Sequence, residues 1–589
     1  MANRLQSATI ALLSLLALIP SSAQKPAQKP AQKPPTYVDT QACSRCHLEI
    51  ANHFAQASMG HSLTQITPEY LKTIQAPASF TDPKTGHQFT VQIENGKLYQ
   101  SESETDAAGK QLFRNTHQLQ WIIGTGENGF GALLRRDDYL FQAPLSYYSK
   151  AAHWQLSPGY QNEALSFNRI LLPGCLYCHS GRPVPIANHP GQYAAQPFTQ
   201  ASVGCENCHG PGSAHVESMG QGDSYAKGKD PTIVNPARLT AKLSDDICMS
   251  CHQTGDTRVL QPGKTYQDFR PGQPLDKTVS IFQIPPTREN PPQDDHVEHY
   301  YSMSLSKCFR ASLSKPEDKR MRCITCHDPH IEPTTAEAPA YFNSRCLTCH
   351  TAQSCKAPKA VRQATSPADN CIGCHMPKRD VVVISHSSIT NHRILARPDE
   401  PFPDAAFQQT SAAMPDLIHL NRASDSAQPP SATASALTRL QAYADILKQK
   451  PQYAATYTAS WLKTLSELET TTTRNALVQA ALGHRDLQDH NLPQAISHLQ
   501  QSLQLDPTQT EACVDLSEAY DQANQPEEAI AAQKKAILLD PFVPALQKTL
   551  VFRLINGKHY EEAQAAMEKY LQLFPEDDFM RKMLAMARE

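Results

Sequence analysis

Seven copies of the pattern Cys-x-x-Cys-His stand out in this 589-residue sequence, and they use fourteen of its seventeen cysteines. Chance predicts roughly 0.02 matches at this composition, so coincidence is excluded. Two thiols at this spacing can bond to the two vinyl groups of one porphyrin, and the adjacent imidazole then lies beneath the iron. The sequence therefore predicts seven covalently bound haems c. The copies are Cys43/Cys46/His47, Cys175/Cys178/His179, Cys205/Cys208/His209, Cys248/Cys251/His252, Cys323/Cys326/His327, Cys346/Cys349/His350 and Cys371/Cys374/His375.

Zinc is the main alternative, because zinc ribbons also use paired Cys-x-x-Cys motifs. Zinc gives no reason for a histidine after every second cysteine, so haem is favoured. Three cysteines remain. Cys308 and Cys355 could pair or stay as buried thiols, and Cys513 is expected in the core of a helical region.

A six-coordinate iron needs a second axial ligand, and seventeen histidines lie outside the motifs. Methionine is a thioether alternative that would raise the potential of its iron. The distal candidates, chosen by local context, are His61, His117, His215, His296, His299, His330, His386, His392 and Met59.

His330 is the strongest of these candidates, because Pro329 fixes the backbone and aims its ring away from its own haem. His215 follows a Gly-Pro-Gly turn, and His386 and His392 flank a Ser/Thr-rich stretch. On a helix, His296 and His299 would share one face, so that one could ligate while the other packs.

The N-terminus has the features of a secretory signal over residues 1–23, with Arg4, an apolar run from Ala8 to Ile19 and small residues before Ala23. The apolar run is too short to span a bilayer, and no later segment looks transmembrane. Residues 24–36, rich in Ala-Gln-Lys-Pro, are expected to form an extended tether. We therefore expect a periplasmic or otherwise exported protein.

The net charge of −3 and the absence of a basic tract make nucleic acid an unexpected partner.

A β insert is predicted over about 79–150. Phe89 to Ile93 and Lys97 to Tyr99, separated by Asn95-Gly96, are typical of a hairpin. The stretch 124–129 matches Gly-x-Gly-x-x-Gly, but no helix follows it, so a hairpin loop is predicted rather than a nucleotide site.

The rest of the haem region, 37–396 overall, shows little periodicity and frequent Pro and Gly, so only short helices around the motifs are expected. Porphyrins would then form most of its core. A Pro-rich linker is predicted over 397–433, and it could still drape over the haem domain. The predicted fold class is mainly α: a haem-cored domain with a small β insert, followed by an α-solenoid.

That solenoid is predicted over 434–589, because Pro507, Pro541 and Pro575 recur every 34 residues. Ala495, Ala529 and Ala563 keep the same interval. This period is typical of tetratricopeptide (TPR) helix pairs, in which small residues allow close packing. Repeats are expected at about 476–509, 510–543 and 544–577, preceded by a degenerate helical pair. Such a stack either docks a partner protein or only stabilises the haem domain.

The haem region resembles the cytochrome c-552/4 (cytochrome c-554-like) domain of exported multihaem cytochromes, and the whole chain looks like the TPR-fused members of that group. The resemblance rests on residues 203–212, 326–330, 374–378 and 390–394. It implies an electron carrier with mostly bis-histidine haems, and it implies distal roles for His215, His330 and His392. Such domains often carry Ser-His-Ala after the first motif, where this chain has Ser58-Met59-Gly60-His61.

The leading functional hypothesis is therefore an electron-transfer protein that docks redox partners through its repeats. The alternative is a multihaem oxidoreductase that acts on a small nitrogen or sulfur compound at one open haem, with Tyr147, Tyr148 or Arg169 nearby. A repeat scaffold with purely structural haems is a third reading. We assign no catalytic residue from the sequence.

Overall fold

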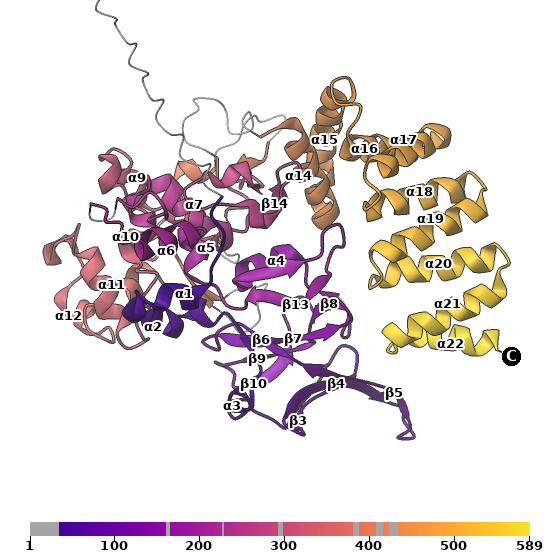
Figure 1. Cartoon of the computed structure of the whole chain (residues 1–589), viewed down its shortest axis with the longest axis horizontal. Helices are drawn as coiled ribbons and strands as arrows, with labels where there is room; N and C mark the ends of the chain where they lie inside the picture. The colour runs from indigo at the N-terminus through magenta and orange to yellow at the C-terminus, as the bar shows by residue number, and fades with distance from the viewer. Residues whose placement is uncertain are drawn as a thin grey trace, which may run out of the picture.

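The computed structural model describes residues 34–160, 165–226, 229–292, 298–380, 388–407, 416–422 and 434–588. Figure 1 shows three regions side by side: short helices that carry most of the motifs, a β region in the middle, and a stack of helix pairs. The predicted signal peptide and most of the predicted tether lie outside the described residues. In the part of the chain that is described, no helix combines the length and the apolar character that crossing a bilayer requires.

The first sheet contains the predicted hairpin. It is antiparallel, in the order β2 (Ala78–Thr81), β3 (Gln88–Glu94), β4 (Lys97–Thr105) and β5 (Gln111–Leu119). Glu94 pairs with Lys97, which leaves Asn95 and Gly96 as a two-residue turn with φ of 50° and 70°. Asn and Gly tolerate these positive angles better than other residues, so the sequence selects this turn.

A seven-stranded sheet packs beside it. Its strands are β1 (Leu63–Gln65), β6 (Trp121–Ile123), β7 (Gly129–Arg136), β8 (Tyr139–Gln142), β9 (Leu145–Tyr148), β10 (His153–Leu156) and β11 (Arg169–Ile170). The glycine-rich stretch 124–129 joins antiparallel strands β6 and β7, so the prediction of a hairpin loop is confirmed. Both sheets contribute to one hydrophobic core that includes Val91, Leu98, Ile122, Phe141 and Phe167.

The β structure is more extensive than the predicted insert of about 79–150. It begins at Leu63 and continues to β12 (Arg182–Pro185) and β13 (Tyr193–Gln200). A further sheet joins β14 (Thr257–Leu260), β15 (Val279–Gln283) and β18 (Ile418–His419). The label mainly α therefore understates the strands of the N-terminal part. Apart from the eight-residue β13, these strands have two to five residues, which is too short to show alternation in a sequence, and their pairing with distant strands makes them strands.

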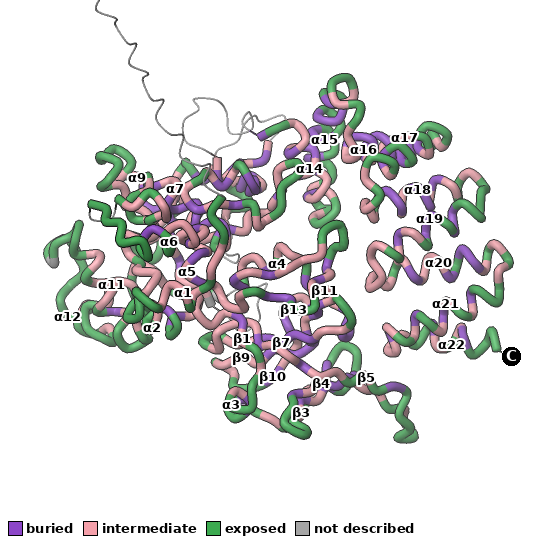
Figure 2. Tube along the Cα trace, viewed as in Figure 1, coloured by how far each residue is buried: buried purple, intermediate pink, exposed green. Residues whose placement is uncertain are grey.

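Short helices occur at the motifs, as predicted. They are α1 (Thr40–Ser44), α4 (Pro173–His179), α5 (Cys205–His209), α7 (Ala241–His252), α10 (Cys323–Cys326), α11 (Ala338–Cys346) and α13 (Cys371–His375). From residue 310 to 390 the described side chains are exposed or half-buried, apart from Pro339 (Figure 2). Three motifs therefore lie in a region whose described residues include almost no fully buried side chain.

The C-terminal helices follow the predicted 34-residue period. The pairs are α16 (Ala476–Gln488) with α17 (Leu492–Leu505), α18 (Thr510–Gln522) with α19 (Pro526–Leu539), and α20 (Pro544–Asn556) with α21 (Tyr560–Leu573), followed by α22 (Asp578–Ala587). Ala495, Ala529 and Ala563 are at most 2% exposed. The predicted earlier pair is α14 (Ala436–Gln449) with α15 (Ala454–Glu469). Cys513 is fully buried, as predicted.

The solenoid is attached to the rest of the protein at both ends. At its start, Val259, Phe282 and Leu417 share one hydrophobic core with α14, α15 and α16. Further along, between α19 and α20, Phe542 packs edge-on against Tyr139 and Phe141 of the β region, and at the far end Arg581 of α22 bonds to Glu104 of β4. Leu417 and β18 belong to the predicted linker, so part of that linker does lie on the N-terminal region.

Candidate functional site

Each motif begins in or beside a helical turn, and this geometry explains its spacing. Residues three apart on a helix share one face, so both thiols of a motif point the same way. Side chains cap several of these turns: Asp39 accepts from the Ala42 N–H (2.8 Å), and Asn370 accepts from the Gly373 N–H (3.0 Å). The caps fix short helices that would not form in isolation.

Three motif histidines face a second histidine at a nearly constant separation. The ring centres of His47 and His215 are 6.3 Å apart, those of His209 and His330 are 6.0 Å apart, and those of His327 and His392 are 6.2 Å apart. Their interplanar angles are 20°, 19° and 28°. Two imidazoles that share one metal, each with a metal–nitrogen bond of about 2.0 Å, have ring centres roughly 6 Å apart. The spacing matches a pair of axial ligands.

The second nitrogen of these rings is held by oxygen atoms. The Nδ1 atom of His209 lies 2.8 Å from the Val234 carbonyl, and that of His392 lies 2.9 Å from the Thr390 carbonyl. A carbonyl only accepts, so Nδ1 carries the proton and Nε2 keeps its lone pair. This outer contact is typical of histidines that ligate metals.

Carboxylates hold two further rings in the same way. Asp230 Oδ2 lies 2.6 Å from His215 Nδ1, and Asp328 Oδ1 lies 3.2 Å from His330 Nδ1. His375 Nδ1 donates to the Leu395 carbonyl at 2.5 Å. Nε2 is therefore the available ligand atom in each of these histidines.

A fourth pair joins His252 to His299, with ring centres 5.5 Å apart and planes at 76°. Burial lowers the pKa of His299 to about 3 and that of His392 to about 4, and neighbouring histidines add to both shifts. Burial also lowers the pKa of His209, His252 and His327. These rings are thus neutral at neutral pH, which is the form that binds a metal.

Thiols of different motifs lie near one another. Cys43 lies close to Cys205, Cys178 lies close to Cys251, and Cys248 lies close to Cys323. Cys208 lies close to Cys248 and Cys251, and Cys346 lies close to Cys326 and Cys371. The motifs therefore form one connected series. The first motif lies next to the third, and the second and third both lie next to the fourth. The fifth motif lies next to the fourth, the sixth next to the fifth, and the seventh next to the sixth.

A continuous cavity of about 3400 Å³ runs between these motifs. A pocket for a single small ligand usually has about 300–1000 Å³, so this volume suits several large groups. Thiols or histidines of six motifs line the cavity, from Cys175 to His375, together with His299, His392 and Met59. The donor atoms, the paired imidazoles and the space together fit several porphyrins attached to these motifs.

The first motif is placed differently from the other six. Cys46 is exposed, as are Cys175, Cys349 and Cys374 of other motifs, but the first motif alone contributes no residue to the cavity lining. The Cys46 N–H donates to the Cys43 carbonyl at 3.2 Å, so the helical turn between the two thiols is kept. The structure brings Cys43 to Cys205 and His47 to His215, but it does not bring Cys46 to the cavity.

The remaining candidates lie elsewhere. His117 is on β5, where its Nε2 is 2.7 Å from Asn115 Oδ1 and its ring packs on Phe167, outside the cavity lining. The structure does not bring it to a motif histidine.

His61 is half-buried in η1 (Ser58–His61), and its neighbour Met59 reaches the cavity. His296 and His386 lie outside the described residues. Cys308 and Cys355 are unpaired. Tyr147, Tyr148 and Arg169 line the cavity.

Sequence reasoning missed the carboxylates that hold the site together. Glu206 is 3% exposed and accepts from the N–H groups of Val38 (2.9 Å) and Gly212 (2.8 Å), which ties the segment before the first motif to the third. Asp230 and Asp245 were also missed. Their spacing from the motifs follows no pattern, so no sequence signal could have found them.

Comparison with known proteins gives one curated relative and a set of repeat structures. The chain is 26% identical over 187 residues to the multiheme cytochrome MtrA of Shewanella baltica (strain OS185). The matched residues make up 30% of this chain. The match spans 51% of that relative, about half its length.

The similar solved structures include MamA, with 20% identity, a TM-score of 0.20, and coverage of 24% of this chain and 88% of that one. They also include TTC0263, a TPR protein of Thermus thermophilus, with 21% identity, a TM-score of 0.19, and coverage of 26% and 90%. Residues 486–554 match the family model described as tetratricopeptide repeat. The C-terminal part of the chain therefore contains a TPR domain.

Proposed function

We propose that this protein is an exported c-type cytochrome that carries electrons through seven covalently bound haems. The observation that carries the proposal is the set of imidazole pairs at 6.0–6.3 Å, each with a histidine of a Cys-x-x-Cys-His motif. The partial similarity to a multiheme cytochrome supports it. The resemblance of the motif segments to the cytochrome c-552/4 domain belongs to the same proposal.

The fourteen motif cysteines would hold the porphyrins, and the seven motif histidines would be the proximal ligands. We assign His215, His330, His392 and His299 as distal ligands opposite His47, His209, His327 and His252, respectively. For His179, His350 and His375 the candidates are Met59, His61, His296 and His386.

Bound haem iron would supply one-electron chemistry by cycling between its ferric and ferrous states. If the paired imidazoles hold the iron, each would leave it without an open site, which would favour electron transfer over binding of a substrate at the iron. Oxygen atoms of Val234, Thr390, Asp230 and Asp328 fix the rings, so that little reorganisation accompanies the transfer. The proximity of thiols from different motifs would keep the haems that they hold close enough for electrons to pass between them.

The decisive experiment is mass spectrometry of the purified protein combined with electron paramagnetic resonance of its oxidised form. We expect the mass of seven covalent haems and a spectrum dominated by low-spin iron. Protein without a covalent mass increment would refute the proposal.

A second candidate is an oxidoreductase with one open haem. It is favoured by Tyr147, Tyr148 and Arg169, which line the same cavity as the second motif. A high-spin signal that nitrite or hydroxylamine displaces would support this function instead of a pure carrier.

The TPR domain would dock redox partners, as such stacks generally do. Its exposed residues Phe552 and Phe579, whose ring centres are 6.4 Å apart, lie on α20 and α22, away from the contacts of Phe542. A Phe552→Ser/Phe579→Ser variant should be reduced more slowly by the exported proteins of the source organism, with an unchanged haem spectrum. An unchanged rate would contradict docking at this face.

An exported, periplasmic location is part of the proposal, and cell fractionation tests it.

A further inference from the structure

The fourth and fifth motifs contact each other through two separate sets of residues. Cys248 and Cys323 are the first set, because their thiols lie close enough to influence each other's ionisation. The second set is His299 and His392, whose ring centres are 4.5 Å apart. His299 also faces His252 of the fourth motif, and His392 faces His327 of the fifth. The two sites are therefore joined both at their cysteines and through the histidines that we assign as distal ligands.

Asp245 lies at the first of these contacts. It precedes Cys248 by less than one turn of α7, and it is 2% exposed. Its Oδ1 accepts the N–H of Cys323 at 2.9 Å. One carboxylate thus belongs to the helix of the fourth motif and caps the first residue of the fifth, which fixes the two segments relative to each other.

Lys242 and Asp246 act on Asp245 in opposite directions, since the cation lowers its pKa and the neighbouring carboxylate raises it. Lys242 makes its ion pair with the adjacent Asp246, whose Oδ2 also accepts the N–H of Leu275 at 3.2 Å. The other titratable neighbours are Tyr300 and Cys323. Burial raises the pKa of Asp245 to about 6, and the hydrogen bond from Cys323 opposes that shift. The carboxylate is therefore ionised at neutral pH.

A buried negative charge favours the ferric state over the ferrous state of a nearby iron, because the ferric site carries one more positive charge. Water screens such a charge poorly in the interior. The effect should therefore be felt at the fourth and fifth sites.

We propose that Asp245 is a positioning residue that holds the fourth and fifth motifs together and lowers the reduction potential of this pair of haems. The inference rests on the proposed function, because it requires covalent haem at both motifs.

The test is a spectroelectrochemical titration of the full-length holoprotein, with Asp245→Asn as the variant. Asparagine keeps the oxygen that accepts from Cys323 and removes only the charge. We expect seven haems by mass and a shift of one or two components of the titration to more positive potential. The control is Asp318→Asn, which removes the same charge from a side chain that is 74% exposed, and it should leave every component in place.

The pH dependence gives a second readout that packing alone would not change. In the wild type, the affected components should fall in potential as the pH rises through about 6, and this fall should be smaller in D245N. If D245N loads fewer than seven haems, the wild-type protein decides, because one or two of its components should still fall in potential as the pH rises through about 6.

The failures are distinguishable. A wild-type protein without covalent haem refutes the proposed function. A fully loaded D245N with unshifted components, or a wild type without the pH-dependent fall where D245N does not load, overturns only the role of Asp245.

Discussion

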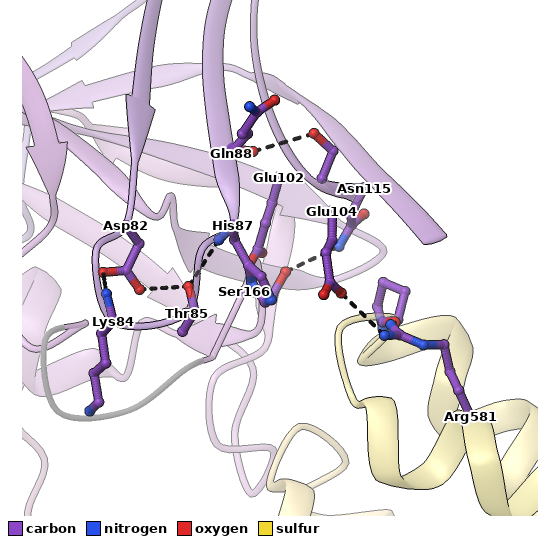
Figure 3. Close-up of polar contacts among 12 residues, drawn as sticks. Asp82, Lys84, Thr85, His87, Gln88, Glu102, Glu104, Asn115, Ser166 and Arg581 are labelled. Carbon is purple, nitrogen blue, oxygen red and sulfur yellow. Dashed lines mark hydrogen bonds and ion pairs between the residues drawn. The ribbon is translucent and has the colours of Figure 1, made fainter. Parts of the chain in front are cut away.

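Arg581, in the last helix, donates from Nη2 to Glu104 Oε2 of strand β4 at 3.2 Å, which joins residues 477 positions apart (Figure 3). The Asn168 amide also donates to the Leu573 carbonyl at 2.6 Å. The TPR domain is thus held at its far end by the β region as well as at its start, so the chain closes on itself.

Loss of the Phe542 side chain should loosen this closure. Phe542 packs on Tyr139 and Phe141 and lies under the Arg136 guanidinium, 5.2 Å from the ring centre. We expect Phe542→Ala to lower the free energy of unfolding by about 1–3 kcal/mol, because these apolar and cation–π contacts disappear. Thermal unfolding measures the change. The control is Phe552→Ala, whose ring is 41% exposed; an equal loss in both variants would speak against the closure.

Alkaline pH should weaken the attachment of the far end of the TPR domain to the β region, through Glu576. Burial raises the pKa of Glu576 from 4.5 to about 8, and the nearby carboxylate of Glu102 adds to the shift. Glu102 is itself buried and lies 2.7 Å from His87 Nδ1. The folded state therefore binds a proton that the unfolded state releases, so the free energy of unfolding falls as pH rises from about 4.5 to 8.

Glu576→Gln should remove this fall, which we expect to amount to about 1–2 kcal/mol. Denaturant unfolding at pH 5 and pH 8.5 measures it. Glu561→Gln, at an exposed position of α21, is the control and should keep the wild-type pH dependence. A steep fall that persists in E576Q would show that another group is responsible.

Replacement of a distal histidine should open one iron. We expect His330→Ala to keep the full haem mass, because both thioether bonds remain, and to convert one low-spin centre to high spin. Electron paramagnetic resonance and absorption spectra measure the conversion. His117→Ala is the matched control, since its ring is bonded to Asn115 instead. A high-spin signal in the control but not in H330A would show that His117, and not His330, is a distal ligand.

Overpacking within the repeats should leave the haem region untouched. Ala529 is 1% exposed and sits where α19 packs against α18, whose Ser517 hydroxyl donates to the Ala529 carbonyl at 2.7 Å. Ala529→Leu should destabilise the protein by about 1–3 kcal/mol, because the larger side chain has no space. The haem absorption spectrum should stay unchanged below the unfolding transition, and a changed spectrum would mean that the two regions are more tightly coupled than their contacts indicate.

The local features of this protein could be predicted from its residues before any fold was known. Both thiols and the histidine of each motif lie within five residues, so one helical turn is enough to bring them together. The Asn95-Gly96 turn and the 34-residue period of the TPR domain are likewise local, because φ angles and close helix packing constrain single residues at fixed intervals.

Which motifs are neighbours, and which distant side chains serve them, depends on the packing of the whole chain. His215 faces His47 across more than 160 positions, Asp245 reaches Cys323, and Arg581 reaches Glu104, whereas Cys46 stays at the surface. No periodicity links such residues, because the contacts arise only when separate segments pack around a shared interior. The short strands escaped prediction for the same reason, since pairing with distant partners, rather than their own alternation, makes them strands.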